Sequence, residues 1–137
     1  MVNGKVFLPK AGGINPEVNC FYQLVNGEYF FNITCADLRD STPKGFSVYV
    51  RKTTLIVGQT YILNKNIIDN GDFAGGGGNY DIGASNRYFT NSLITGELRI
   101  TKLDPSNSII SGTFWFDAVN TAGEKVEIRQ GRFDWRY

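Results

Sequence analysis

The stretch from Gly96 to Tyr137 reads GELRITKLDPSNSIISGTFWFDAVNTAGEKVEIRQGRFDWRY, and its pattern decides the fold. Apolar and polar residues alternate over residues 98–101 and again over residues 110–118. A period of two is typical of half-buried β-strands. The residues between them, Asp104-Pro105-Ser106-Asn107-Ser108, predict a three-residue hairpin loop, because proline suits its first position and asparagine tolerates the left-handed conformation.

This loop sets the register of the first two strands. If Asp104 pairs with Ser108, Leu98 comes to lie opposite Phe114, so that apolar side chains meet on one face. A shift by one residue would set apolar against polar residues. The register therefore agrees with the pattern of both strands.

A second connection over residues 120–124 carries its glycine where a left-handed residue closes a three-residue loop. Phe116 then lies opposite Ile128 on the buried face, and Trp115 lies opposite Arg129 on the other face. The stretch is therefore predicted to form a three-stranded antiparallel meander.

The buried parity changes in the last strand. Ile128 is even-numbered, whereas Phe133, Trp135 and Tyr137 are odd-numbered, and Gln130-Gly131 between them suits a bulge or a corner. We expect the final strand to turn onto a second sheet and to place Trp135 in the core.

These motifs resemble an uncharacterised family of small, β-rich, often lipid-anchored bacterial envelope proteins. The resemblance covers the last third of the chain well and implies an exported location, but it brings no agreed activity or catalytic residue. The motifs that carry it are Gly96-x-Leu98-x-Ile100-Thr101, Ile110-Ser111-Gly112-Thr113-Phe114-x-Phe116-x-Ala118, Val126-x-Ile128 and Gly131-x-Phe133.

The rest of the chain indicates further short strands and no helix of any length. Alternation predicts strands near residues 5–8, 20–24, 29–35, 46–51, 60–63 and 87–90, and one long loop or irregular edge over residues 64–86. The expected fold is all-β, an antiparallel β-sandwich or flattened barrel of nine or ten strands. Residues 1–137 form one domain, as a chain of this length normally does.

Cys20 and Cys35 fall on the same face of a predicted hairpin, and its turn decides whether they can bond. A type I′ turn on Asn26-Gly27 makes the two cysteines diagonal neighbours, whereas a type II′ turn on Gly27-Glu28 sets them directly opposite each other. Local turn chemistry favours Asn-Gly, whereas an exported location and the presence of just two cysteines favour the bridge. We predict a Cys20–Cys35 disulfide, with two buried thiols as the alternative.

Composition excludes several classes of function. Fourteen basic and thirteen acidic residues give a net charge of +1, and the basic residues are scattered, so nucleic acid is not expected as a partner. The chain has no histidine, which removes histidine-activated nucleophiles and the commonest metal ligand. No apolar run approaches the roughly 20 residues of a membrane span, so we expect membrane attachment only through a removed or missing lipid anchor.

Two clusters invite a cofactor or catalytic interpretation, and we favour a simpler one for each. The Gly75–Gly78 run and the nearby Asp69, Asp72 and Asp81 match no phosphate or calcium motif, so we expect a mobile loop with solvated acids and no metal or other cofactor. Asp117 and Glu127, a cross-strand acid pair, are expected to be neutralised by neighbouring cations.

Glu97, Trp115 and Arg129 are predicted to form a row across the outward face of the meander. An exposed indole stacks on sugars, and flanking charges orient hydroxyl groups. The alternative is that Trp115 and Arg129 only stabilise the sheet. We expect a non-catalytic extracytoplasmic binding or adhesion module whose partner is a glycan or another envelope protein. A lipocalin-like barrel carrying a small apolar ligand is the second hypothesis, and a carboxylate-dependent hydrolase is the third.

Overall fold

The computed structural model describes residues 1–14, 16–69 and 71–137, and in these residues it contains nine strands and no helix. The expected all-β fold is confirmed. The strands are β1 (Val18–Val25), β2 (Glu28–Asp37), β3 (Lys44–Arg51), β4 (Thr60–Leu63), β5 (Gly75–Ile82), β6 (Asn86–Phe89), β7 (Gly96–Asp104), β8 (Ile109–Val119) and β9 (Lys125–Arg136).

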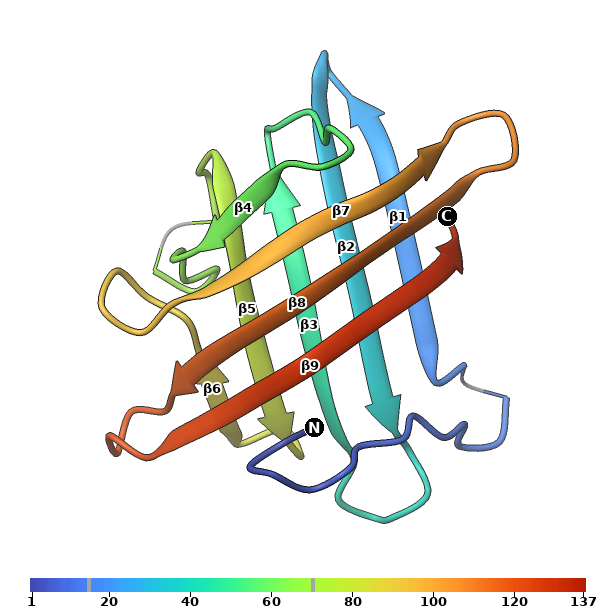
Figure 1. Cartoon of the computed structure of the whole chain (residues 1–137). Helices are drawn as coiled ribbons and strands as arrows, with labels where there is room; N and C mark the ends of the chain where they lie inside the picture. Colours follow the sequence, from blue (N-terminus) through green and yellow to red (C-terminus); the bar gives the residue numbers. More distant parts are fainter. Residues whose placement is uncertain (15, 70) are drawn as a thin grey trace.

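The strands form two layers, and β7, β8 and β9 cross obliquely over β1, β2, β3 and β5 (Figure 1). The first layer is an antiparallel ladder in the order β1-β2-β3-β5, with β6 on the far half of β5. The second layer has the order β4-β7-β8-β9 and is also antiparallel. Each layer has one face toward the other, which is how a sandwich buries its core.

Hydrogen bonds join the layers along one side. Leu63 of β4 pairs with Gly76 of β5, and Phe89 of β6 pairs with Val119 of β8. The β4–β5 contact is parallel, so the sheet is mixed and not purely antiparallel as the sequence suggested. At the opposite side, β1 and β9 are edge strands with no ladder between them in the described residues. The molecule is a sandwich closed on one side only.

The space between the layers is filled by side chains from both. The rings of Phe46 and Phe114 meet across it with centroids 5.5 Å apart, and those of Phe31 and Phe133 with centroids 5.8 Å apart. Burying each such side chain contributes about 1.5–3 kcal/mol. The most fully buried members are Phe31, Ile33, Val48, Val50, Leu63, Leu98, Ile100, Ile110, Phe116 and Ile128.

The glycine run that predicted a mobile loop is instead the start of β5, a central strand. β5 pairs with β3 over its whole length, from Arg51↔Gly75 to Lys44↔Ile82. The loop prediction over residues 64–86 was wrong here because glycine carries no side chain with which to show alternation. Asn70, within the same predicted loop, lies outside the described residues.

Each face of this glycine strand touches an aromatic ring. A Cβ on Gly78 would lie 3.1 Å from the ring of Phe116 in the core. On the other face, a Cβ on Gly77 would lie 2.6 Å from the ring of Tyr49, and it would also overlap the carbonyl oxygen of Lys65. At Gly77 and Gly78 glycine is needed because neighbouring side chains and backbone press on β5 from both sides, whereas Gly75 is also favoured by its positive φ of 119°.

The predicted register of β7 and β8 is confirmed around Leu98 and Phe114, although the hairpin loop between the two strands differs from the prediction. Asp104 pairs with Ile109, not Ser108, so the loop has four residues and Ser108 takes the left-handed conformation at φ 54°. A bulge between Ile100 and Lys102 then shifts the register back by one residue. The two differences cancel, and Leu98 faces Phe114 and Glu97 faces Trp115 as expected.

The bulge expected in the last strand is present, but the strand does not leave its sheet. Between Phe114↔Gly131 and Phe116↔Ile128, two residues of β9 lie opposite Trp115 alone, and Gln130 has φ 55°. β9 then stays paired with β8 as far as Arg136, so the predicted turn onto a second sheet was wrong. Trp135 has the inward parity but is 41% exposed, and the prediction that it lies in the core is corrected.

Residues 1–14 form no strand, contrary to the prediction for residues 5–8. Val2 makes isolated bridges to Lys5 and to Ile128, and the backbone NH of Asn3 donates to the carbonyl of Glu127 at 2.8 Å. The N-terminal residues therefore pair with the outer edge of β9 near its bulge.

The hairpin of β1 and β2 uses the type I′ turn, and this decides the cysteine geometry. Asn26 and Gly27 both have positive φ, and Val25 pairs with Glu28. Cys20 therefore faces Ile33 instead of Cys35, and the predicted disulfide is not formed: both cysteines are free thiols. Burial, helped by the nearness of Cys35, raises the pKa of Cys20 to about 12, and burial raises that of Cys35 to about 11.

Candidate functional site

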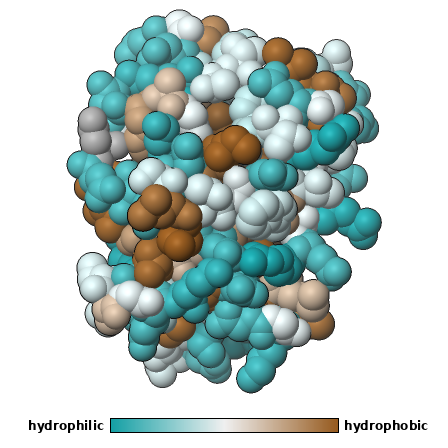
Figure 2. All heavy atoms as spheres, turned by 60° about the vertical axis from the view of Figure 1, so that its left-hand side comes forward, coloured by the Kyte–Doolittle hydropathy of each residue, from teal (hydrophilic) through white to brown (hydrophobic). Residues whose placement is uncertain are grey.

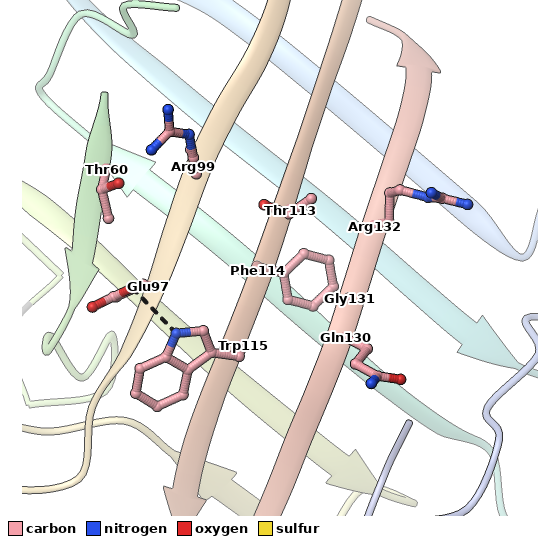
Figure 3. A pocket seen from close by; sticks show the side chains of 9 residues that line it. All are labelled: Thr60, Glu97, Arg99, Thr113, Phe114, Trp115, Gln130, Gly131 and Arg132. Atoms are coloured by element: carbon pink, nitrogen blue, oxygen red, sulfur yellow. Dashed lines mark hydrogen bonds between the residues drawn. The ribbon is translucent and has the colours of Figure 1, made fainter. Parts of the chain in front are cut away.

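The largest hollow of those found in the described residues lies on the outer face of β4, β7, β8 and β9, with a volume of about 800 Å³ (Figure 3). Its polar lining comes from successive strands, because outward residues of paired strands lie side by side. Around it stand Glu97, Arg99, Thr113, Trp115, Gln130 and Arg132.

Trp115 is the main apolar group of this hollow. Its neighbours in β8, Phe114 and Phe116, are buried in the core, and successive side chains of a strand point to opposite faces, so Trp115 points outward. Trp115 is 36% exposed, and its indole Nε1 donates a hydrogen bond to Glu97 Oε2 at 3.3 Å (Figure 3). The cross-strand pairing of Glu97 and Trp115 thus fixes how the indole lies on the sheet.

Arg129 reaches Trp115, as predicted, but from outside the hollow. Its guanidinium carbon lies 5.3 Å from the centroid of the indole. The same group donates to the carbonyls of Phe116 at 3.2 Å and Ile128 at 3.0 Å, and it forms an ion pair with Asp117 at 2.5 Å. Arg129 therefore supports the ring, and the β9 bulge sends the next residue, Gln130, to the hollow in its place.

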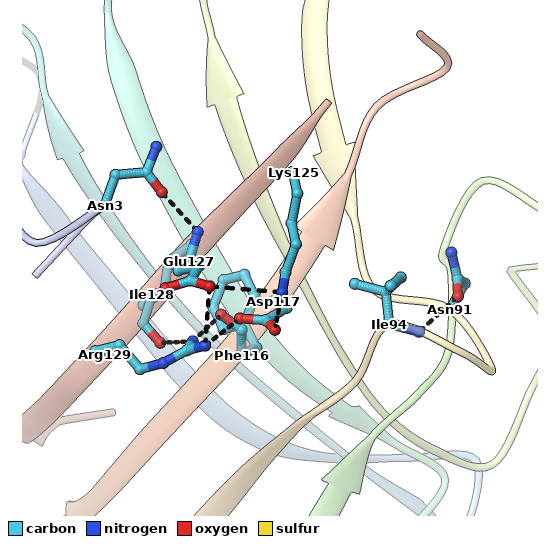
Figure 4. A network of polar contacts seen from close by, with 9 residues as sticks. All are labelled: Asn3, Asn91, Ile94, Phe116, Asp117, Lys125, Glu127, Ile128 and Arg129. Carbon is cyan, nitrogen blue, oxygen red and sulfur yellow. Dashed lines mark hydrogen bonds and ion pairs between the residues drawn. The ribbon is translucent and has the colours of Figure 1, made fainter. Parts of the chain in front are cut away.

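The acid pair behind Trp115 is neutralised by two cations, as the sequence suggested (Figure 4). Lys125 lies 2.8 Å from Asp117 and 3.5 Å from Glu127, and Arg129 lies 2.5 Å and 3.7 Å from the same two residues. Burial acts to raise the pKa of Asp117, but the adjacent Lys125 and Arg129 outweigh it, so that its pKa lies below the ordinary value.

The sequence reasoning missed a second row next to the predicted one. Arg99 pairs with Thr113 on one side, and Arg132 pairs with Thr113 on the other. All three line the hollow. Arg99 and Thr113 share the odd parity of Glu97 and Trp115, which was a usable signal, whereas Arg132 is set outward by the bulge.

A glycine opens the bottom of the hollow. The ring of Phe114 lies beneath Gly131, where a Cβ would overlap that ring, and both residues line the hollow (Figure 3). The ring of Phe114 therefore forms part of the floor, next to Gly131, which has no side chain to displace it.

A second, smaller hollow of about 410 Å³ lies on the outer face of β1, β2 and β3. Its lining is more apolar and includes Phe21, Phe30, Tyr49 and Ile67. Arg51 also lines it, and its guanidinium carbon lies 5.5 Å from the centroid of the Phe30 ring and 5.6 Å from that of Phe73, so this cation already has aromatic partners.

The acids considered for calcium do not gather at one point. Asp81 accepts hydrogen bonds from Asn79 at 2.8 Å and Arg87 at 2.9 Å, and Asp72 forms an ion pair with Lys52. In residues 1–14, 16–69 and 71–137, no three metal-binding side chains of the His, Cys, Asp and Glu types lie close enough to hold an ion together.

The surface offers no single broad apolar area on the side that Figure 2 shows, where hydrophilic side chains divide the hydrophobic ones into separate patches. Such scattered apolar residues are normal for a protein surface. In the part of the chain that the structure describes, no helix has the length and apolar character to cross a membrane.

Residues 44–134 match the model of a family described as a domain of unknown function, DUF6252. The chain belongs to this family. The matched residues run from the start of β3 into β9 and so include every residue around the large hollow. The resemblance to an uncharacterised family is thereby confirmed over a longer segment than the motifs of the last third. Comparison with curated proteins and with solved structures finds no match.

Proposed function

We propose that this domain is a non-catalytic glycan-binding module that works outside the cytoplasm, at the bacterial cell envelope. The observation that carries the proposal is the partly exposed ring of Trp115 in the large hollow, with its Nε1 held by Glu97 at 3.3 Å. Indole rings fixed in this way on a flat sheet offer a sugar an apolar face to stack on, while neighbouring polar groups bind its hydroxyls.

The polar groups around the ring suit hydroxyl recognition. Glu97 has a carboxylate that accepts hydrogen bonds, Thr113 has a hydroxyl that donates and accepts, and Gln130 has an amide that does both. These three side chains come from β7, β8 and β9. Because they are held on rigid strands, little conformational entropy is lost when a ligand binds.

The carboxylates argue for binding without catalysis. Glycoside hydrolysis normally uses two carboxyl groups about 5–10 Å apart on either side of the bond that breaks. Of the residues lining the hollow, Glu97 alone is acidic. Asp117 and Glu127 lie close together, but both are bound to Lys125 and Arg129. The lowered pKa of Asp117 also makes it a poor proton donor.

The second hypothesis, a barrel carrying an apolar ligand, has less support. A lipocalin-like carrier needs an interior space, and here the interior is occupied by rings and aliphatic side chains from both layers. The support for the exported location is the resemblance of the motifs to envelope proteins. A lipoprotein leader encoded upstream of this chain would support it, and a cytoplasmic fusion partner there would contradict it.

Affinity gel electrophoresis against a panel of polysaccharides tests the binding. We expect at least one polysaccharide to retard the protein, and we expect Trp115→Ala and Glu97→Ala to remove the retardation while the circular dichroism spectrum stays the same. Trp135→Ala is the matched control, since Trp135 is similarly exposed, at 41%, but lies outside the hollow. If no polysaccharide retards the protein, or if Trp115→Ala is retarded as much as wild type, the proposal is wrong.

A further inference from the structure

Two arginines in the large hollow have no acidic partner. Arg99 and Arg132 flank Thr113 on the neighbouring strands, and both are exposed. In the described residues neither side chain forms an ion pair within 4.0 Å, a hydrogen bond or an aromatic contact. An anion placed over Thr113, between the two strands that carry these cations, would be attracted by both of them.

Three other arginines of the chain form ion pairs. Arg39 forms an ion pair with Asp37, Arg87 with Asp81, and Arg129 with Asp117. Arg136 is also exposed and forms no ion pair in the described residues, but it lies outside the hollow. Arg99 and Arg132 differ from it because both line the same hollow, beside the partly exposed indole of Trp115.

We propose that the ligand of this hollow is an acidic saccharide, one whose sugar carries a carboxylate or a sulfate group. The anionic group binds between Arg99 and Arg132 with the hydroxyl of Thr113 beneath it, and the ring of the sugar stacks on Trp115. This inference rests on the proposed glycan binding and adds the charge of the ligand to it.

The spacing along the sheet fits one sugar with its substituent. Arg99 and Arg132 are two strands apart, which places their backbones about 10 Å from each other. Thr113 and Trp115 are two residues apart on β8, or about 7 Å. Figure 3 shows the two arginine side chains on opposite flanks of Thr113, because they come from β7 and β9. Their long stems allow both guanidinium groups to turn toward a bound anion.

The acid of the hollow sets the direction of the ligand. Glu97 lies on the Trp115 side, next to the indole nitrogen, and would repel a carboxylate placed there. The anionic end is therefore confined to the arginine row, and the uncharged hydroxyls are directed to the row of Glu97, Trp115 and Gln130. The site is therefore predicted to bind a charged sugar in one orientation, because the arginines attract its anionic group and Glu97 repels it.

Paired ligands test the inference directly. Oligogalacturonate and its carboxyl-reduced, neutral counterpart differ only in the carboxylate. Chondroitin sulfate and unsulfated chondroitin both carry carboxylates and differ only in the sulfate. We expect isothermal titration calorimetry to give at least tenfold tighter binding to oligogalacturonate than to its neutral counterpart, or to chondroitin sulfate than to unsulfated chondroitin, with an affinity that falls as salt is raised.

Variants at the row separate a defined site from general attraction. Arg99→Gln and Arg132→Gln should each weaken binding of the acidic sugar about tenfold, as expected for loss of a charged hydrogen bond, and leave binding of the neutral sugar unchanged. Arg136→Gln is the matched control, because Arg136 lies on the same strand and is exposed but does not line the hollow.

The outcomes separate the two proposals. If oligogalacturonate binds no better than its neutral counterpart and chondroitin sulfate no better than unsulfated chondroitin, the acidic-saccharide inference is wrong and the proposed glycan binding stands. The inference is also wrong if Arg136→Gln weakens binding as much as Arg132→Gln. If no member of either pair binds, the inference is overturned, and a failure of the whole polysaccharide panel overturns the glycan proposal with it.

Discussion

The meander of β7, β8 and β9 and the central strand β5 lie in the same sandwich, yet only the meander can be derived from its residues. In the meander, apolar side chains occur at every second position and mark the buried face. In β5 the first four residues are glycine, so there are no side chains to alternate. The alternation of apolar and polar residues identifies a strand by the side chains that it buries. It fails for a glycine strand, which has no side chains and leaves space for those of neighbouring strands.

β5 is recognised only through residues distant in sequence. Tyr49 comes from β3 and Phe116 from β8, and each rests against a different face of the glycine run. The hydroxyl of Tyr49 also donates to the carbonyl of Lys65 at 3.2 Å. This hydrogen bond holds the segment that follows β4 over the outer face of β5. A run of glycines between two strand-forming segments therefore indicates close packing as readily as it indicates mobility.

The largest expected effect tests the buried face of the meander. Phe114 is 6% exposed and its ring meets those of Phe46 and Phe133, so we expect Phe114→Ala to lower the free energy of unfolding by about 3–5 kcal/mol. Chemical denaturation followed by circular dichroism measures it. A loss below about 1 kcal/mol would mean that the face assigned to the core is not buried.

The next effect tests the central glycine strand. Gly77→Ala places a methyl group against the ring of Tyr49 and the carbonyl of Lys65, and the backbone atom cannot move aside, so we expect a loss of about 2–3 kcal/mol. Gly71→Ala is the control, since its nearest neighbour would be 3.9 Å away, and it should change stability by less than about 0.5 kcal/mol. Equal, small effects would restore the interpretation of residues 75–78 as a loop.

Much of the fold could be predicted because turn chemistry and alternation agree in most strands. The hairpin at Asn26-Gly27, the strand Thr60–Leu63 and the pairing of Phe116 with Ile128 all follow from local sequence. The loop after Asp104 was assigned one residue too few, and a bulge in β7 hid the error by cancelling it. Bulges depend on how neighbouring strands twist, which a single strand does not reveal.

The candidate site was predicted in part for the same reason. The prediction that Glu97, Trp115 and Arg129 lie together is confirmed, because the outward face of each strand was assigned correctly. The bulge at Arg129 and Gln130 then added an outward residue, set Arg132 outward and left Arg129 behind the indole. Which charged residues remain without partners is a tertiary property, so the importance of Arg99 and Arg132 is visible only in the structure.

A smaller effect concerns the charged network on the outer face of the meander. The pKa of Asp117 is lower than its ordinary 3.8, so its contribution to stability is fully present above that value and is lost as the pH falls through the lower folded pKa. Asp117→Asn should cost about 1–2 kcal/mol at pH 7, with solvent around Lys125 and Arg129 keeping it modest.

The difference in stability between this variant and wild type should shrink as the pH is lowered below 3.8, because protonation of Asp117 weakens its ion pairs. Denaturant titrations of the two proteins at pH 7 and at pH 2 measure this convergence. An unchanged difference between them at the two pH values would show that the ion pairs are not what Asp117 contributes.

The smallest effect on stability is expected at Trp115, which is the neighbour in sequence of Phe114, where the largest effect is expected. Its ring rests on the outside of the sheet and gains a cation–π contact with Arg129, worth about 0.5–1 kcal/mol at an exposed site, and a hydrogen bond to Glu97 that solvent can replace. Trp115→Ala should therefore cost about 1 kcal/mol or less, with an unchanged denaturant slope. Trp115→Phe keeps a ring over the sheet and removes the indole nitrogen, so its stability should lie between that of wild type and that of Trp115→Ala.

A loss of stability at Trp115 as large as that of Phe114→Ala would mean that this face of the meander is covered in the folded protein, and a covered face has no room for a sugar. A small loss at Trp115 beside a large one at Phe114 would establish that the two neighbours in β8 serve different purposes, Phe114 holding the layers together and Trp115 remaining available to a ligand.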